Sequence, residues 1–210
     1  MKNYLFDLDG LLIDSETLYF NANKIYFAQF GFEFTAELHK EYTGKKFEEW
    51  IKTAINIDID GPTMLEGRNK IYFKLAESQL RLMDGAKDLL AYTKAQGKTA
   101  LVTSSNNDYV DFVFKRTGIG SYFDLVITGD QVTKGKPDPE GYMKAASYFG
   151  VDPKNCIVFE DSPNGVLAGK NAGMRVVAVP SVYVACDTIF ENADLVLKSL
   201  GDYVKNEHKI

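Results

Sequence analysis

Four short polar groups stand where the sequence predicts the ends of strands. They are Asp7-Leu8-Asp9-Gly10, Thr103-Ser104-Ser105, Lys136-Pro137 and Glu160-Asp161-Ser162. Taken singly, each group has a structural explanation, because Asp and Ser commonly cap the helix or turn that follows a strand. Taken together, they offer carboxylates, hydroxyl groups and an amine, which could perform metal-assisted chemistry on a phosphate group.

The acidic residues of these groups point to a metal site. Asp7, Asp9, Glu160 and Asp161 would bring four carboxyl groups to one edge of a sheet. Their mutual repulsion there requires a bound cation, protonation, or both. A donor set made only of oxygen atoms favours Mg²⁺, which also shares its coordination shell with substrate phosphates. We therefore expect Mg²⁺ as the cofactor.

The other two groups supply what a phosphoryl group needs. Lys136 offers a fixed positive charge, and the turn at Thr103-Ser104-Ser105 offers hydrogen-bond donors. The four groups together predict a phosphate-binding pocket.

A doubly wound parallel sheet would bring the four groups to one edge, because its ligands bind beyond the carboxyl ends of the strands. Short runs rich in Val, Ile, Leu and Phe predict strands buried on both faces, and segments with a 3.6-residue period separate them. The predicted strands span residues 4–7, 99–103, 125–128, 157–160, 176–179 and 195–197, and the predicted helices 86–96, 108–117, 139–149 and 163–172. This alternation predicts an α/β fold of the doubly wound type.

Glycines and one Ser-Pro pair mark the borders of these helices. Ser162-Pro163 is typical of an N-cap followed by the first helical position. Four glycines each follow a helical run, where a left-handed C-terminal cap is expected: Gly97, Gly118, Gly150 and Gly173.

Residues 15–83 interrupt the alternation. This segment shows no convincing buried strand, and we expect it to form an inserted helical bundle with an aromatic core. The core domain would then comprise residues 1–14 and 84–210. The predicted helices of the insertion span residues 15–30, 35–42, 47–55 and 62–80.

Composition narrows the class of protein. The chain has 210 residues, of which 45% are hydrophobic and 25% charged, and this excludes a disordered or collagen-like chain. A net charge of −5 argues against a binder of nucleic acid or anionic membrane, and no apolar stretch approaches the length of a membrane span. We expect a cytoplasmic protein. Cys156 and Cys186 lack metal-like spacing and are predicted to be small buried residues.

The order of the motifs DxDG, LVTSS, GKPDP and FEDSPNG resembles that of the haloacid dehalogenase superfamily, specifically its phosphatases and phosphomutases. The resemblance runs from Asp7 to about Val179. The helical insertion is similar to the α-helical cap of the branch that includes β-phosphoglucomutase. The resemblance implies a Rossmann-like core, a mobile lid, and a Mg²⁺-dependent phosphatase that acts on small phosphorylated metabolites, such as sugar phosphates or nucleoside monophosphates.

The resemblance also implies a role for each motif residue. Asp7 would attack phosphorus and form an aspartyl-phosphate, while Asp9 would act as the general acid and then as the general base. Thr103 and the backbone N–H of Ser104 would bind the transferring phosphoryl group, and Lys136 rather than Lys134 would neutralise its charge. The metal would be held by Asp7, the carbonyl of Asp9, Asp161, and Glu160 directly or through water.

Three other functions stay open. A β-phosphoglucomutase-type phosphomutase carries a histidine on the first cap helix and a Gly-x-Ser-Arg stretch, where this chain has Tyr19 and Thr43-Gly44-Lys45-Lys46. Both differences favour the phosphatase. A phospho-acceptor signalling domain would lack both the lid and a proton donor two residues after the acceptor. A regulatory binding protein that does not hydrolyse its ligand would lack one of the catalytic groups, and the sequence lacks none of them.

The insertion offers weaker candidates. Glu16 and Lys46 are predicted to bind substrate, although Asp14 nearby could simply cap a helix and Lys45 and Lys46 could form a solvated face. His39, at the expected periphery of the lid, and His208, in a charged tail, are given no role. The only expected partner is a small-molecule phosphate ester, with no nucleic acid and no membrane, and the chain is expected to be a monomer, with a dimer as the alternative.

Overall fold

The computed structural model describes residues 2–42, 60–181, 184 and 187–205, and it divides the chain into two compact units. One unit comprises Met1–Ile13 and Arg81–Ile210, and the other comprises Asp14–Leu80.

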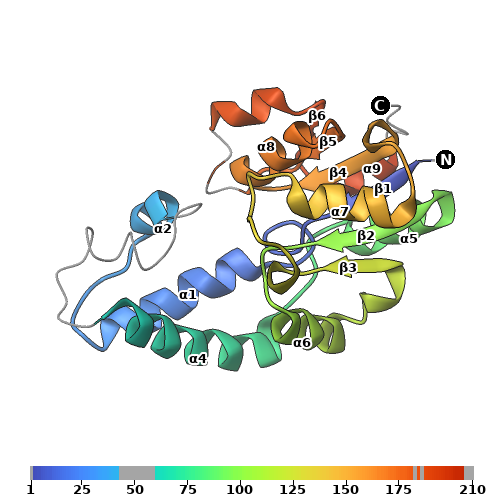
Figure 1. Ribbon diagram of the computed structural model, residues 1–210. Coiled ribbons are helices and arrows are strands. Elements are labelled where there is room, and N and C mark those ends of the chain that lie inside the picture. The colour runs from blue at the N-terminus through green and yellow to red at the C-terminus, as the bar shows by residue number, and fades with distance from the viewer. Residues whose placement is uncertain (1, 43–59, 182–183, 185–186, 206–210) are drawn as a thin grey trace. The chain divides into compact units, whose positions relative to one another are not determined.

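The first unit is built on a six-stranded parallel sheet with the strand order β3-β2-β1-β4-β5-β6 (Figure 1). From β1, the chain builds the sheet outward first through β2 and β3 and then, on the other side, through β4, β5 and β6. This order makes the sheet doubly wound, which confirms the predicted fold class. β1 and β4 are buried along their whole lengths, as expected for strands covered on both faces. The strands are β1 (Asn3–Phe6), β2 (Lys98–Val102), β3 (Leu125–Ile127), β4 (Cys156–Glu160), β5 (Arg175–Ala178) and β6 (Leu195–Val196).

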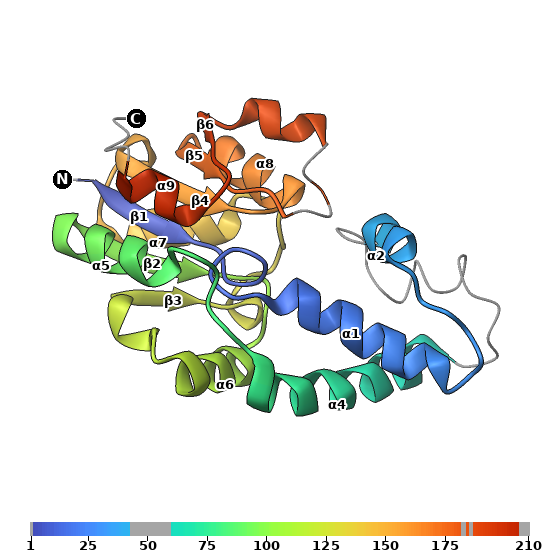
Figure 2. The same ribbon diagram turned by 180° about the vertical axis from the view of Figure 1, so that it is seen from behind.

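Helices cover both faces of this sheet. α7 and α8 lie in front of it in Figure 1, and α5 and α9 lie in front of it in the reverse view of Figure 2. The helices of this unit are α5 (Ala86–Gln96), α6 (Asn107–Thr117), α7 (Glu140–Phe149), α8 (Pro163–Asn171) and α9 (Leu200–Lys205). Short 3₁₀ turns span Gly120–Tyr122, Gly129–Gln131, Pro153–Asn155 and Thr188–Asn192.

Most of the predicted helix borders are confirmed. The Ser162 side chain caps α8, and Gly118, Gly150 and Gly173 adopt positive φ angles after α6, α7 and α8. The prediction for Gly97 was wrong, because its φ of −178° is extended. The reason for glycine there is space: a Cβ would lie 1.9 Å from the carbonyl oxygen of Lys2, where the chain enters the strand beside β1.

The second unit is helical in its described parts. It contains α1 (Ser15–Ala28), α2 (Ala36–Tyr42) and α4 (Gly61–Gln79), and α1 packs against α4. Its core is largely aromatic, as predicted: the buried cluster consists of Tyr26, Phe27, Phe34 and Met64. The helix predicted at residues 47–55 lies outside the described residues.

Two further predictions can be compared with the structure. Cys156 is a buried free cysteine, as expected, whereas Cys186 lies outside the described residues. Among the described helices, none has the length and apolar character needed to cross a membrane.

Candidate active site

The strand order brings three of the four polar groups to neighbouring positions at one edge of the sheet. β1 lies between β2 and β4, so the segments that leave these strands start side by side. The backbone N–H of Asp7 donates to the carbonyl of Phe159 at 3.1 Å, which places Asp7 directly beside Glu160 at the end of β4. The side chain of Lys136 reaches the same place from the loop before α7.

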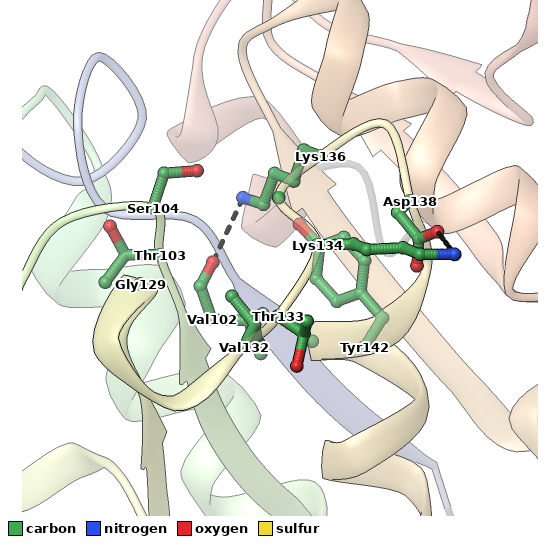
Figure 3. Close-up of a pocket in the computed structure, with 12 residues that line it drawn as sticks. Val102, Thr103, Ser104, Gly129, Val132, Thr133, Lys134, Lys136, Asp138 and Tyr142 are labelled. Carbon is green, nitrogen blue, oxygen red and sulfur yellow. Dashed lines mark hydrogen bonds and ion pairs between the residues drawn. The ribbon is translucent and has the colours of Figure 1, made fainter.

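Lys136 joins two carboxylates of this edge. Its Nζ lies 2.5 Å from Oδ1 of Asp7 and 2.6 Å from Oε1 of Glu160. It also donates to the carbonyl of Val102 at 3.0 Å, as Figure 3 shows. The Lys136 side chain is only 12% exposed. Lys134 instead faces Asp138, at 3.8 Å, and is largely exposed. Of these two lysines, Lys136 is therefore the one that the fold delivers to the acidic cluster.

Glu160 is completely buried, and hydrogen bonds hold both of its oxygen atoms. Oε1 accepts from Lys136 and, at 2.6 Å, from the Tyr142 hydroxyl. Oε2 accepts from the backbone N–H and the hydroxyl of Ser162, at 3.4 and 3.1 Å. A carboxylate offers about four lone-pair positions, so these bonds fill the acceptor capacity of Glu160.

Burial controls the electrostatics of this cluster. The pKa of Asp7 is raised from 3.8 to about 7, chiefly by desolvation and also by the neighbouring charges of Glu160 and Asp9, while Lys136 acts in the opposite direction. Burial by itself would lower the pKa of Lys136, but the two carboxylates outweigh it and hold that pKa well above its ordinary range. The site therefore keeps a permanent positive charge against carboxylates that are poorly solvated.

Three buried acids could hold a metal ion. Asp7, Glu160 and Asp161 each offer a carboxylate oxygen, and these atoms lie within 4.8 Å of one another. Gly10 makes room for this arrangement, since a Cβ there would lie 2.2 Å from Oδ2 of Asp161. The donor atoms are all oxygen, so the cluster fits a hard divalent cation and does not resemble a zinc site.

The side chain of Asp9 takes part in a different set of contacts. Its Oδ1 accepts from the Tyr109 hydroxyl at 2.8 Å, and its Oδ2 accepts from the Ser105 hydroxyl at 2.7 Å. The carboxylate of Asp9 is thus tied to the segment that follows β2, and it is not among the three acids that could hold a metal ion.

A cavity of about 250 Å³ lies beside Lys136 (Figure 3). In Figure 3, Thr103 and Ser104 lie on one side of it, and Lys134, Asp138 and Tyr142 lie on the other. Thr103 is buried, and its hydroxyl accepts from the backbone N–H of Ser105 at 3.1 Å. The predicted phosphate-binding residues therefore line a space that is open to a ligand.

In the helical unit, the structure changes the interpretation of one predicted residue. His39 is not peripheral: it is completely buried, and its Nε2 lies 3.2 Å from the carboxylate of Glu16. The ring centre of His39 lies 5.2 Å from that of Phe20 and 6.1 Å from that of Phe34. Asp14 caps α1 by accepting from the N–H of Thr17 at 3.4 Å.

The remaining insertion residues are only partly described. Lys45 and Lys46 lie outside the described residues. Tyr19, where a mutase of the resembling branch would carry histidine, stacks on Tyr72 with ring centroids 4.1 Å apart. The guanidinium of Arg68 lies 4.7 Å from the centre of the Tyr19 ring.

Three residues of the site were not singled out from the sequence. Tyr142 and Tyr109 occupy apolar positions of helical patterns, where a tyrosine is most simply interpreted as core. Gly165 left a weak signal, because a glycine inside a helical pattern often marks a close approach. Here a Cβ on Gly165 would lie 1.8 Å from the carboxyl carbon of Glu160.

Comparison with known proteins agrees with this geometry. The family model described as haloacid dehalogenase-like hydrolase matches residues 4–179. The chain is 34% identical over 205 residues to validoxylamine A 7′-phosphate phosphatase of Streptomyces hygroscopicus subsp. limoneus, covering 96% of this chain and 95% of that protein. It is 31% identical over 183 residues to a phosphorylated carbohydrates phosphatase of Thermotoga maritima, covering 83% of each.

A solved structure extends the agreement to the whole fold. The crystal structure of CbbY from Rhodobacter sphaeroides in complex with phosphate superimposes with a TM-score of 0.80. The two chains are 27% identical, and the match covers 97% of this chain and 96% of that one.

Proposed function

The chain belongs to the haloacid dehalogenase-like hydrolase family and is a phosphatase of that type, and we propose that it hydrolyses sugar phosphates through an aspartyl-phosphate on Asp7, with Mg²⁺ as cofactor. The observation that carries this proposal is the position of Asp7. Its carboxylate stands in a buried cluster with two further acids and is paired with Lys136 at 2.5 Å. A nucleophile that attacks a phosphate dianion needs such opposing charge.

Mg²⁺ would be held by the carboxylates of Asp7 and Asp161 and by the backbone carbonyl of Asp9. Glu160 would contact it directly or through water, and either contact would replace one of the hydrogen bonds that this carboxylate accepts. When bound, the ion would offset the negative charge that the acidic cluster and the phosphate bring together.

In the first half of the proposed reaction, an oxygen of Asp7 attacks the phosphorus atom of the ester. The new bond joins Asp7 to phosphorus, and the bond from phosphorus to the ester oxygen breaks. Asp9 enters this step protonated and gives its proton to the departing oxygen, so the product leaves as an alcohol. Lys136, Thr103 and the N–H of Ser104 hold the phosphoryl oxygens in place.

In the second half, water attacks the phosphorus atom of the aspartyl-phosphate. Asp9, now ionised, takes a proton from this water, and the bond between Asp7 and phosphorus breaks. Inorganic phosphate leaves, Asp7 returns as a carboxylate, and Asp9 is again protonated. The cycle therefore consumes one ester and one water and returns every residue to its initial state.

The substrate class is supported by the relatives. Validoxylamine A 7′-phosphate and phosphorylated carbohydrates are the substrates that their names state, and the second name states the carbohydrate class directly. A phosphomutase would need the departing sugar to return to the aspartyl-phosphate before water does. The stacking of Tyr19 on Tyr72 puts an aromatic pair where a mutase of the resembling branch carries histidine, which favours hydrolysis.

The test is to incubate the chain and Mg²⁺ with hexose phosphates, pentose phosphates, polyol phosphates and nucleoside monophosphates. Released phosphate is measured, and sugar-phosphate isomers are followed by NMR. Phosphate release from sugar phosphates that stops with EDTA and returns with Mg²⁺ is the expected result. Isomerisation without net phosphate release would establish the mutase instead.

A second experiment tests the intermediate. Rapid acid quench with ³²P-labelled substrate should leave label on the peptide that contains Asp7, and Asp7→Asn should carry none. The matched control is Asp111→Asn on the exposed side of α6, which should be labelled like the wild type. Turnover of substrate with no label on Asp7 at any time would overturn the covalent route.

A further inference from the structure

We propose that Tyr109 and Ser105 are positioning residues that orient the carboxyl group of Asp9 for proton transfer. The inference rests on the proposed function, in which Asp9 is the acid and then the base. Neither hydroxyl is needed to bind phosphate for this role, because both act on Asp9 itself.

The contacts are specific to the two oxygen atoms of Asp9. The Tyr109 hydroxyl donates to Oδ1 at 2.8 Å, and the Ser105 hydroxyl donates to Oδ2 at 2.7 Å. Both lengths are typical of good O–H···O hydrogen bonds. Two donors, one on each oxygen, fix the plane of the carboxyl group. Without them the terminal torsion of an aspartate is broad.

Both donors stand on backbone that is itself held. The side chain of Asn106 caps α6 by accepting from the N–H of Tyr109 at 2.9 Å. This bond fixes the backbone from which the Tyr109 side chain extends. The Tyr109 ring is 6% exposed and thus packed in the core. The N–H of Ser105 donates to the Thr103 hydroxyl at 3.1 Å. The hydroxyls are therefore preorganised.

The bonding leaves Asp9 able to react. Each carboxylate oxygen has two lone pairs, and one hydroxyl occupies one of them on each atom. A carboxylate oxygen that accepts one hydrogen bond can still carry the proton that the mechanism gives to the ester oxygen and takes from water. A hydroxyl group also accepts hydrogen bonds, so either contact can persist when Asp9 is protonated.

This arrangement has a measurable consequence, because a group that orients the acid matters most when the leaving group needs the proton. Phenolate is a poorer leaving group than p-nitrophenolate, and both esters bind through the same phosphate. Loss of orientation should therefore slow the first chemical step more for phenyl phosphate than for p-nitrophenyl phosphate. KM should change little, because neither hydroxyl is required to hold the phosphate.

The experiment compares Tyr109→Phe and Ser105→Ala with the wild type. Tyr109→Phe keeps the buried ring and removes only the hydroxyl, and the matched control is Tyr148→Phe on the exposed face of α7. First-turnover release of phenol should fall about tenfold in Tyr109→Phe, which is part of the roughly 10²–10⁴-fold that acid–base catalysis supplies. The fall for p-nitrophenol should be about threefold or less, and Tyr148→Phe should match the wild type.

A double-mutant comparison separates positioning from a general structural role. In a chain that already carries Asp9→Asn, the additional change Tyr109→Phe should produce no further fall in the phenyl phosphate rate. An equal further fall would overturn the inference, and so would wild-type rates in Tyr109→Phe and Ser105→Ala. Thermal melting verifies that each variant is folded. If Tyr109→Phe does not fold, the rates of Ser105→Ala test the inference.

Failure of the proposed function gives a different result. If the wild type releases no phosphate from either ester or from any sugar phosphate, the proposed function falls, and this inference falls with it. If the wild type is active and the two variants are unaffected, only the inference falls.

Discussion

The absence of a side chain at Gly165 makes room for the carboxylate of Glu160. A Cβ at Gly165, within α8, would lie 1.8 Å from the carboxyl carbon and 2.0 Å or less from both oxygen atoms. The carboxylate therefore sits against the first turn of this helix, where the positive end of the helix dipole favours a negative charge. The same carboxylate accepts from Lys136 at 2.6 Å, and Lys136 in turn pairs with Asp7. The helix therefore acts on Asp7 through the side chains of Glu160 and Lys136.

Gly165→Ala should lower phosphatase activity by at least about tenfold, because Glu160 must move and Lys136 loses its partner. In an ordinary helix, this change would stabilise the protein by roughly 0.5–1 kcal/mol. Gly201→Ala in α9 is the control, since a Cβ there meets neighbouring atoms only at 3.8 Å. Phosphate release and thermal melting measure both effects. Wild-type activity in Gly165→Ala would contradict this account of Glu160.

Lys136→Ala should abolish measurable phosphatase activity and destabilise the folded chain at neutral pH. The lysine is the cation that pairs with Asp7 and Glu160, and removing one partner of a buried ion pair costs about 3–5 kcal/mol. Urea unfolding at pH 7.5 without metal measures the cost.

The matched control for Lys136→Ala is Lys170→Ala. Lys170 pairs with Asp194 at 2.8 Å, but both side chains are about one-third exposed. Its removal should cost about 1 kcal/mol or less and leave activity unchanged. If both lysine variants lost the same free energy of unfolding, the burial of the Lys136 ion pairs would not increase their contribution to stability.

The fold could be predicted because its elements are marked locally. Strands buried on both faces are visible as apolar runs, and Gly118 and Gly150 end their helices in the left-handed conformation that glycine favours. α9 was not predicted, since its six residues are too few to show a period and only Leu200 and Tyr203 are buried. Gly97 shows the limit of such signals, because a cap and a close backbone approach both select glycine.

The convergence of Asp7, Glu160 and Asp161 could also be predicted, because it depends only on strand order and on which residues follow the strands, whereas Lys136 reaches the same place from the loop before α7. The partners of these acids could not. Whether Tyr142 meets Glu160 depends on how α7 crosses the sheet, and whether Tyr109 meets Asp9 depends on the position of α6. A tyrosine on the apolar side of a helix carries no local mark of such a contact.

The pKa of Asp7 predicts how stability changes with pH in the absence of a cation. Burial raises this pKa from 3.8 to about 7, so between about pH 4 and pH 7 the folded chain binds a proton that the unfolded chain releases. The free energy of unfolding must then fall as pH rises through this interval. The interval of about three pH units corresponds to about 4 kcal/mol.

Asp7→Asn removes this proton. Its free energy of unfolding, relative to the wild type, should rise by about 4 kcal/mol between pH 4 and pH 8 in EDTA, as measured by urea titration. Asp111→Asn, which changes an exposed carboxylate on α6, serves as the control and should follow the wild type throughout. If Asp7→Asn also kept the wild-type pH dependence, Asp7 would not be the titrating group.

Gly10→Ala should weaken the binding of Mg²⁺. Gly10 has a φ of 76°, and its Cβ would lie 2.2 Å from Oδ2 of Asp161, so the new methyl group would displace the carboxylate of one proposed ligand. Gly31→Ala is the control: its φ is 71°, which imposes a similar strain, but nothing lies within 4 Å of the added Cβ. Both variants should lose roughly 1 kcal/mol or more of stability in EDTA, since alanine is strained at such angles.

The melting temperatures of the two variants should differ when Mg²⁺ is added. An ion that binds only the folded chain raises the melting temperature, and the gain grows with its concentration relative to Kd. Gly31→Ala should gain as much as the wild type, while Gly10→Ala should need at least about tenfold more Mg²⁺ for the same gain. Because both variants carry a similar backbone strain, a difference between them would come from the contact with Asp161, and equal gains in both would contradict the assignment of Asp161 as a ligand.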